Sequence, residues 1–163
     1  KQAAVRILVS RSVHPGKYTT LWTGTVEDVS ESLKAAVRLE KTSLVDLLFL
    51  PYVHDKVIQA LSRLYNPNIK LEALGVLEAT SVASLIKAAD IAVKCALVHF
   101  ISMRLADHLG GKSFFTLTGE MGDLQSAMEM AVAYTVERKT FLHKVIIPNP
   151  HPEMGAVLQG KTV

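Results

Sequence analysis

The sequence contains a single cysteine, Cys95, among its 163 residues. One thiol excludes a framework of internal disulfide bonds and fits a protein that stays in a reducing interior. Long apolar runs are also missing: stretches such as 44–51 are interrupted within eight residues, too few for a helix that spans a bilayer. No secretory signal is visible, so we expect a soluble intracellular protein.

Charged residues are scarce as well. They make up 20% of the chain, whereas 49% of the residues are hydrophobic and the mean hydropathy is +0.26. This mean hydropathy is high for a soluble monomer and indicates apolar surface that is buried between subunits. The net charge of +3 is spread along the chain without a basic run, so nucleic-acid binding is not indicated.

Catalytic motifs are absent from the sequence. The chain has no G-x-S-x-G, phosphate-binding glycine loop, H-E-x-x-H or paired C-x-x-C motif. Acidic residues such as Glu27, Asp28 and Asp123 fall at the starts of predicted helices, where the helix dipole accounts for them. We therefore predict that the protein is not an enzyme.

What the sequence does contain is an internal repeat. Residues 17–24 (KYTTLWTG) match 112–119 (KSFFTLTG) at a spacing of 95 positions. Residues 1–11 match 94–104 at a spacing of 93, and 50–54 (LPYVH) match 147–151 (IPNPH) at 97. Such small shifts at loops are typical of a divergent duplication. The repeat predicts two domains, 1–65 and 71–158, joined by the turn-rich linker 66–70.

The second copy predicts an α/β (α+β) unit of the ferredoxin-like type. Amphipathic stripes indicate helices at 82–93, with Ser81 as the N-cap, and at 121–136. Strand patterns fall at 73–77, 97–103, 113–118 and 143–147. The resulting order, β-α-β-β-α-β, is that of a ferredoxin-like split unit.

The first copy begins at the counterpart of Lys94, so it lacks the opening strand and helix. The missing part corresponds to the 23 residues 71–93 of the second copy. A sheet without that strand would expose an edge. We expect that the sequence is trimmed at its start, or that a C-terminal element of a neighbour fills the gap.

Five segments of the second copy resemble the successive signatures of the bacterial microcompartment shell domain: 72–78 (EALGVLE), 88–94 (AADIAVK), 110–112 (GGK), 119–123 (GEMGD) and 147–151 (IPNPH). The resemblance covers 72–154, and a degenerate second match covers 1–61. With 13–17 (VHPGK) included, the pattern is most similar to tandem shell proteins of the propanediol-utilisation type, which trimerise into pseudohexamers. It implies a structural tile with a central pore.

The resemblance also implies partners and a location. Tiles of this family pack edge to edge into the shell of a bacterial microcompartment in the cytoplasm. The expected partners are further copies of the chain in a homotrimer, other shell proteins, enclosed enzymes and small metabolites in the pore, but no nucleic acid and no membrane.

The tile edge is expected at two positions. In the family, the lysine at the position of Lys94 lies at the edge and pairs across neighbouring tiles, and Lys1 is its counterpart in the first copy. The family usually has an arginine where this chain has Asn149, and Tyr52 occupies that place in the first copy. One contact between tiles is therefore expected to be altered.

By the same resemblance, two loops of each chain line the pore. They consist of Val13, His14, Pro15 and Gly16 in the first copy and His108, Leu109, Gly110 and Gly111 in the second. Glycine lets the backbone approach an axis, and exposed N–H groups can meet anionic solutes. Ordinary hairpin turns use such glycines too, so both interpretations stay open.

His14 is the candidate metal ligand of these loops. Propanediol-type relatives have a cysteine there, and three such thiolates hold an iron–sulfur cluster. Because this chain has an imidazole instead, we do not expect the cluster, and we expect no resident cofactor. Three imidazoles around an axis would suit a single zinc, nickel or similar ion or, when protonated, an anion, whereas a solvent-facing histidine without metal is the alternative.

The remaining histidines and the cysteine have structural expectations. His54 and His151 should cap or hydrogen-bond a turn, and His99 and His143 should face solvent or a polar neighbour. We expect Cys95 to be a small buried residue at a helix end. The rival functional interpretations are a trimeric ligand-binding regulatory protein of ferredoxin-like fold and a pore protein that carries a metal or redox centre.

Overall fold

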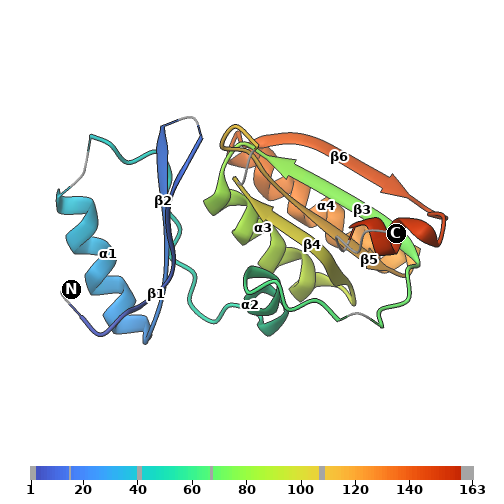
Figure 1. Ribbon diagram of the computed structural model, residues 1–163, viewed down its shortest axis with the longest axis horizontal. Helices are drawn as coiled ribbons and strands as arrows, with labels where there is room; N and C mark the ends of the chain where they lie inside the picture. Colours follow the sequence, from blue (N-terminus) through green and yellow to red (C-terminus); the bar gives the residue numbers. More distant parts are fainter. Residues whose placement is uncertain (1–2, 15, 40–41, 67, 107–108, 159–163) are drawn as a thin grey trace.

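Two sheets of unequal size organise the chain (Figure 1). The computed structural model describes residues 3–14, 16–39, 42–66, 68–106 and 109–158. The smaller sheet is the hairpin of β1 (Arg6–Val13) and β2 (Lys17–Thr23). The larger sheet has the order β4 (His99–Leu105), β5 (Ser113–Gly119), β3 (Ala73–Ala79), β6 (Phe141–Ile147). The helices are α1 (Val26–Leu39), α2 (Asp55–Leu61), α3 (Val82–Cys95), α4 (Met121–Glu137) and α5 (Glu153–Leu158).

The second half confirms the β-α-β-β-α-β order predicted from the sequence. Its elements run β3, α3, β4, β5, α4, β6, and all neighbouring strands are antiparallel. Ser81 is the N-cap of α3, because its Oγ accepts a hydrogen bond from the Ser84 N–H at 3.2 Å. The strand β3 lies in the centre between β5 and β6, and most of its residues are buried.

The two long helices of the second half pack closely on the sheet and on each other. Small residues make this approach possible: Ala88, Ala89 and Ala92 of α3 and Ala127 and Ala131 of α4 are fully buried. At Gly75 in β3, a Cβ would lie 3.0 Å from Leu124 Cδ1 and 3.1 Å from Met128 Cγ. Glycine at this position therefore gives α4 the space to lie directly against the central strand.

The described part of the first half has no strand that corresponds to β6. The sequence aligns 44–50 with the region of β6, yet these residues form no strand. β6 pairs only with β3, and the described part of the first half contains no strand of the β3 type. Without a partner, the segment runs along the second half instead, where Leu48, Leu50 and Val53 pack against the core.

A short helix that the sequence patterns did not predict follows the final segment of each copy. α2 follows His54 and α5 follows His151. Nδ1 of His54 accepts a hydrogen bond from the Lys56 N–H at 3.1 Å, and Nδ1 of His151 accepts one from the Glu153 N–H at 3.4 Å. The prediction that both histidines cap a turn is confirmed.

The prediction that Cys95 is buried is wrong. Cys95 is exposed, and its Sγ lies 3.9 Å from the Ser126 carbonyl oxygen. It is the last residue of α3, so it lies at the end of the helix rather than over the sheet. In the described residues, no helix is long and apolar enough to cross a membrane.

Candidate functional site: paired loops and the junction of the halves

The first predicted pore loop is the turn of the β1–β2 hairpin. Val13 is buried and pairs with Lys17 across the hairpin. His14 at the tip is exposed to solvent. Gly16 has φ of +66°, a left-handed conformation that favours glycine, although a Cβ there would meet no atom within 4 Å. Pro15 lies outside the described residues.

The second predicted pore loop is the turn between β4 and β5. The Ala106 N–H donates to the Lys112 carbonyl at 3.0 Å, and the Lys112 N–H donates to the Leu109 carbonyl at 3.1 Å. Gly110 and Gly111 have φ of +62° and +84°. The turn geometry by itself therefore explains both glycines. Leu109 is half-buried, and His108 lies outside the described residues.

The two loops meet within one chain. A Cβ on Gly111 would lie 3.1 Å from Lys17 Nζ. Nearby, Nη2 of Arg11 donates a hydrogen bond to the Leu105 carbonyl at 3.1 Å. In Figure 1 the end of the β1–β2 hairpin accordingly lies beside the end of the β4–β5 hairpin. The turns of the β1–β2 and β4–β5 hairpins, which are equivalent in the two copies, therefore lie next to each other. The sequence alone did not show this proximity.

The predicted edge residues fall in two different places. Lys94 lies in the last turn of α3, where its Nζ donates to Asp90 Oδ2 at 2.6 Å and to the Tyr52 carbonyl at 2.9 Å. Asn149 is exposed in the turn after β6. The structure therefore brings Lys94 to Tyr52, the counterpart of Asn149 in the first copy. Lys1 lies outside the described residues.

Asp46 joins the first half to the start of α3. Its Oδ2 accepts hydrogen bonds from Ser81 Oγ and, at 3.3 Å, from Ser84 Oγ, and its Oδ1 lies 3.3 Å from Arg138 Nη2. A carboxylate at the positive end of a helix dipole is stabilising. No sequence pattern indicated this role, because Asp46 lies 35 positions from Ser81 and 92 positions from Arg138 in the chain.

Two further contacts from the first half reach β4 and the residue just before it. The Tyr65 hydroxyl accepts a hydrogen bond from the Met103 N–H at 2.9 Å, and Lys56 Nζ donates to the Val98 carbonyl at 2.8 Å. Burial raises the pKa of Tyr65 and lowers the pKa of Lys56. Since exposed strand edges invite pairing with other chains, these contacts protect β4.

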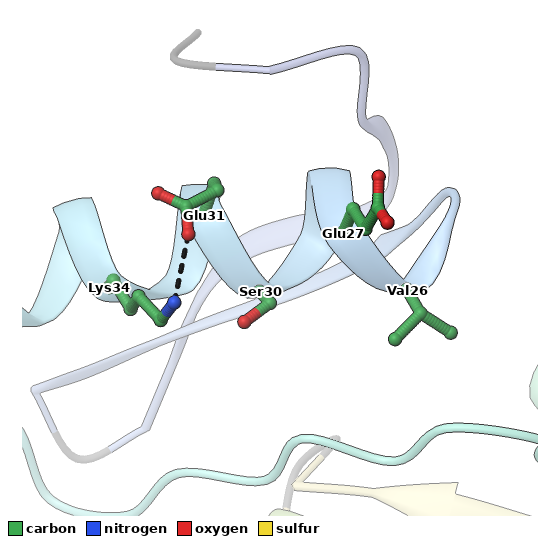
Figure 2. Close-up of a pocket in the computed structure, with 5 residues that line it drawn as sticks. All are labelled: Val26, Glu27, Ser30, Glu31 and Lys34. Atoms are coloured by element: carbon green, nitrogen blue, oxygen red, sulfur yellow. Dashed lines mark hydrogen bonds and ion pairs between the residues drawn. The ribbon is translucent and has the colours of Figure 1, made fainter.

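A shallow groove lies along α1 (Figure 2). It is lined by Val26, Glu27, Ser30, Glu31 and Lys34, all from this one helix. Lys34 Nζ lies 2.8 Å from Glu31 Oε1, and this hydrogen bond lowers the pKa of the Glu31 carboxyl. Among the described residues of one chain, no group of three or more histidine, cysteine or acidic side chains could hold a metal ion.

Comparisons with known proteins fit this architecture. A model of the BMC domain family matches residues 73–150, the unit from β3 to the turn after β6. The chain is 35% identical to the bacterial microcompartment shell protein PduT of Citrobacter freundii over 154 residues, which cover 94% of this chain and 83% of that protein. The chain belongs to the bacterial microcompartment shell proteins.

The solved structures extend this result to both halves of the shell protein. The crystal structure of a microcompartments protein from Desulfitobacterium hafniense matches with a TM-score of 0.85 and 39% sequence identity, over 94% of this chain and 85% of that chain. The match therefore includes the first half, which lies outside the family match. The shell protein is a structural component of the microcompartment shell and not an enzyme, as the sequence predicted.

Proposed function

We propose that the shell protein assembles as a homotrimer with six-fold pseudo-symmetry, a tile in which the two halves alternate around a central opening. Three chains with two related halves each would supply six units. The observation that carries the proposal is the meeting of Lys17 with Gly111, because it brings equivalent hairpin ends of the two halves together. Consecutive units of a closed ring need this arrangement.

The rim of the opening would be formed by the two loops described above. Its residues are Val13, His14, Pro15, Gly16, His108, Leu109, Gly110 and Gly111. Their positive-φ glycines keep both turns narrow, with the exposed Gly16 and Gly110 at the surface. We infer that small metabolites or ions pass here.

The first half would form a second shell domain once a strand pairs with the outer edge of β2. In the second half, β5 is the counterpart of β2, and β3 pairs with the equivalent edge of β5. Exposed apolar residues of the hairpin, Ile7, Leu8 and Tyr18, support a covered surface in the assembly. The strand would come from a preceding segment of the same chain or from a neighbouring copy, and the mass of the intact chain distinguishes these sources.

Assembly tests the proposal directly. Light scattering after gel filtration should give the mass of a trimer, and electron microscopy should show sheets, tubes or stacked hexagonal arrays. A monomer would refute it. A discrete trimer that forms no arrays and changes shape with a small ligand would instead support a regulatory protein of ferredoxin-like fold.

The edge of the tile would contain Lys94 and Asn149. Both are exposed: Lys94 lies in the last turn of α3, and Asn149 lies in the turn after β6. Lys94→Ala should leave the trimer intact and reduce sheet formation seen by electron microscopy. Loss of the trimer in this variant would place Lys94 inside the ring instead of at its edge.

An iron–sulfur cluster on the axis does not fit this chain. The loop presents the His14 imidazole where a thiolate would be needed, and Cys95 lies at the end of α3. We infer that His14 is a solvent-facing residue; a zinc or nickel ion held by three imidazoles is the alternative. Elemental analysis of the purified trimer decides this, since stoichiometric metal that disappears in His14→Ala would establish the ion.

A further inference from the structure

We propose that Asp90 is a positioning residue, which joins the two halves of the chain and sets the direction of Lys94. The inference deepens the proposed function, because it rests on Lys94 lying at the tile edge. Asp90 lies in α3, one turn before Lys94, and its side chain is 0% exposed. A fully buried carboxylate is costly unless charged or polar groups satisfy it.

The partners of Asp90 come from both halves of the molecule. Oδ1 accepts a hydrogen bond from the His54 N–H at 2.9 Å, and Oδ2 accepts one from Lys94 Nζ at 2.6 Å. Lys87 Nζ lies farther away, 3.8 Å from Oδ2. His54 is also the N-cap of α2, so one carboxylate connects α3 of the second half with the start of α2.

Lys94 closes a ring of contacts around the turn at Tyr52. Its Nζ donates to the Tyr52 carbonyl at 2.9 Å as well as to Asp90, so two of its three N–H donors are used within the chain. The side chain is still 43% exposed. A partner would therefore meet an ammonium group whose orientation Asp90 has already set.

The same contacts hold an unfavourable backbone conformation in place. Tyr52 has φ of +56°, a left-handed conformation that non-glycine residues rarely adopt. Lys94 binds the carbonyl of this residue, and Asp90 binds the N–H two residues later. Asp90 thereby fixes the shape of the turn as well as the direction of the amine.

Two measurements on the soluble protein test this role. Hydrogen–deuterium exchange of peptides over 52–61 reports the His54 N–H, and the rate of lysine acylation reports the freedom of the Lys94 amine, with exposed Lys144 as the internal reference. In Asp90→Asn we expect Lys94 to be acylated about 3–10 times faster, because a charge-assisted hydrogen bond is lost. Exchange over the turn should accelerate by a similar factor.

Three further variants make the test specific. Lys94→Gln should accelerate exchange over 52–54 about as much as Asp90→Asn, and the double variant should add little, because both changes break one connected set of contacts. Lys87→Gln is the matched control: it removes a cation from the same carboxylate at 3.8 Å and should change neither measurement more than about twofold.

The outcomes separate this inference from the proposed function. Unchanged acylation of Lys94 in Asp90→Asn, or additive effects in the double variant, would overturn the role of Asp90. If Asp90→Asn does not fold, unchanged exchange in Lys94→Gln would overturn it equally. Absence of sheets from the wild-type protein would contradict the proposed function. The role of Asp90 further requires that Asp90→Asn and Lys94→Gln reduce sheet formation to a similar extent and that Lys87→Gln does not reduce it.

Discussion

Helices α1 and α4 occupy equivalent places in the two copies, yet they differ greatly in burial. The buried residues of α4 are Leu124, Ala127, Met128, Ala131 and Thr135, whereas in α1 only Ser32 is buried. α4 packs against both α3 and the sheet, and the described part of the first half offers α1 no helix of the α3 type. An amphipathic pattern thus predicts which face of a helix is apolar, but not whether that face is covered.

The comparison also shows how the first half is held. α2 carries Val57 and Ala60, which are buried in the core of the second half. Asp46 and Asp90 add polar contacts at the two ends of α3. The first half therefore gains much of its stability from the second half, and substitutions on the two sides should have unequal effects.

The largest difference is expected between equivalent helix positions. Met128→Ala in α4 should reduce the free energy of unfolding by about 2–5 kcal/mol, because Met128 is fully buried. Leu33→Ala, at the equivalent half-buried position of α1, should cost only about 1 kcal/mol. Urea unfolding of both variants at one protein concentration measures this, and equal losses would show that α1 is as well covered as α4.

The contribution of α2 to the shared core is expected to be next. Val57→Ala should destabilise the protein by about 1–3 kcal/mol, since it removes two buried methyl groups from the contact between the halves. The adjacent Ile58 is 43% exposed, so Ile58→Ala should cost less than about 1 kcal/mol. Thermal unfolding compares the two, and a larger loss for Ile58→Ala would argue against the described packing of α2.

A smaller effect is expected at the start of α3. Asp46→Asn removes the charge that meets Ser81, Ser84 and Arg138, and it should cost about 1–2 kcal/mol. Arg138→Gln should cost less than about 1 kcal/mol, because that side chain is half-exposed. Urea unfolding with and without salt checks this order; the opposite order would mean that Arg138, not the helix start, dominates the contact.

The smallest effect concerns pH. Burial, then the charge of Lys56, lowers the pKa of His99, while Glu72 opposes this shift. The folded state therefore takes up the proton less readily than the unfolded state, so stability is highest above the unfolded pKa of about 6.5 and falls as the pH drops through it. Tm should fall on going from pH 7.5 to 5.5, and His99→Gln should reduce this fall by less than about 2 °C. A larger fall of Tm in His99→Gln than in the wild type would show that protonation of His99 stabilises the folded state, contrary to this prediction.

Much of the second half could be predicted from local patterns. The order of its strands and helices and the caps formed by Ser81 and His151 depend on residues close together in sequence, as does the cap formed by His54 in the first half. The glycines of the two hairpin turns could also be predicted from local sequence. The burial of Cys95 was predicted wrongly, because residue type and helix pattern do not reveal where a helix ends relative to the sheet.

By itself, the sequence determined the duplication, the β-α-β-β-α-β order of the second half and the shell family, because periodicity, caps and motif spacing are local properties. Only the tertiary structure decided that 44–50 packs along the second half, that Asp46 contacts Ser81, and that Asp90 and Lys94 hold the turn at Tyr52. These contacts join residues far apart in the chain. They depend on which surfaces find a partner in space, and no local pattern records that.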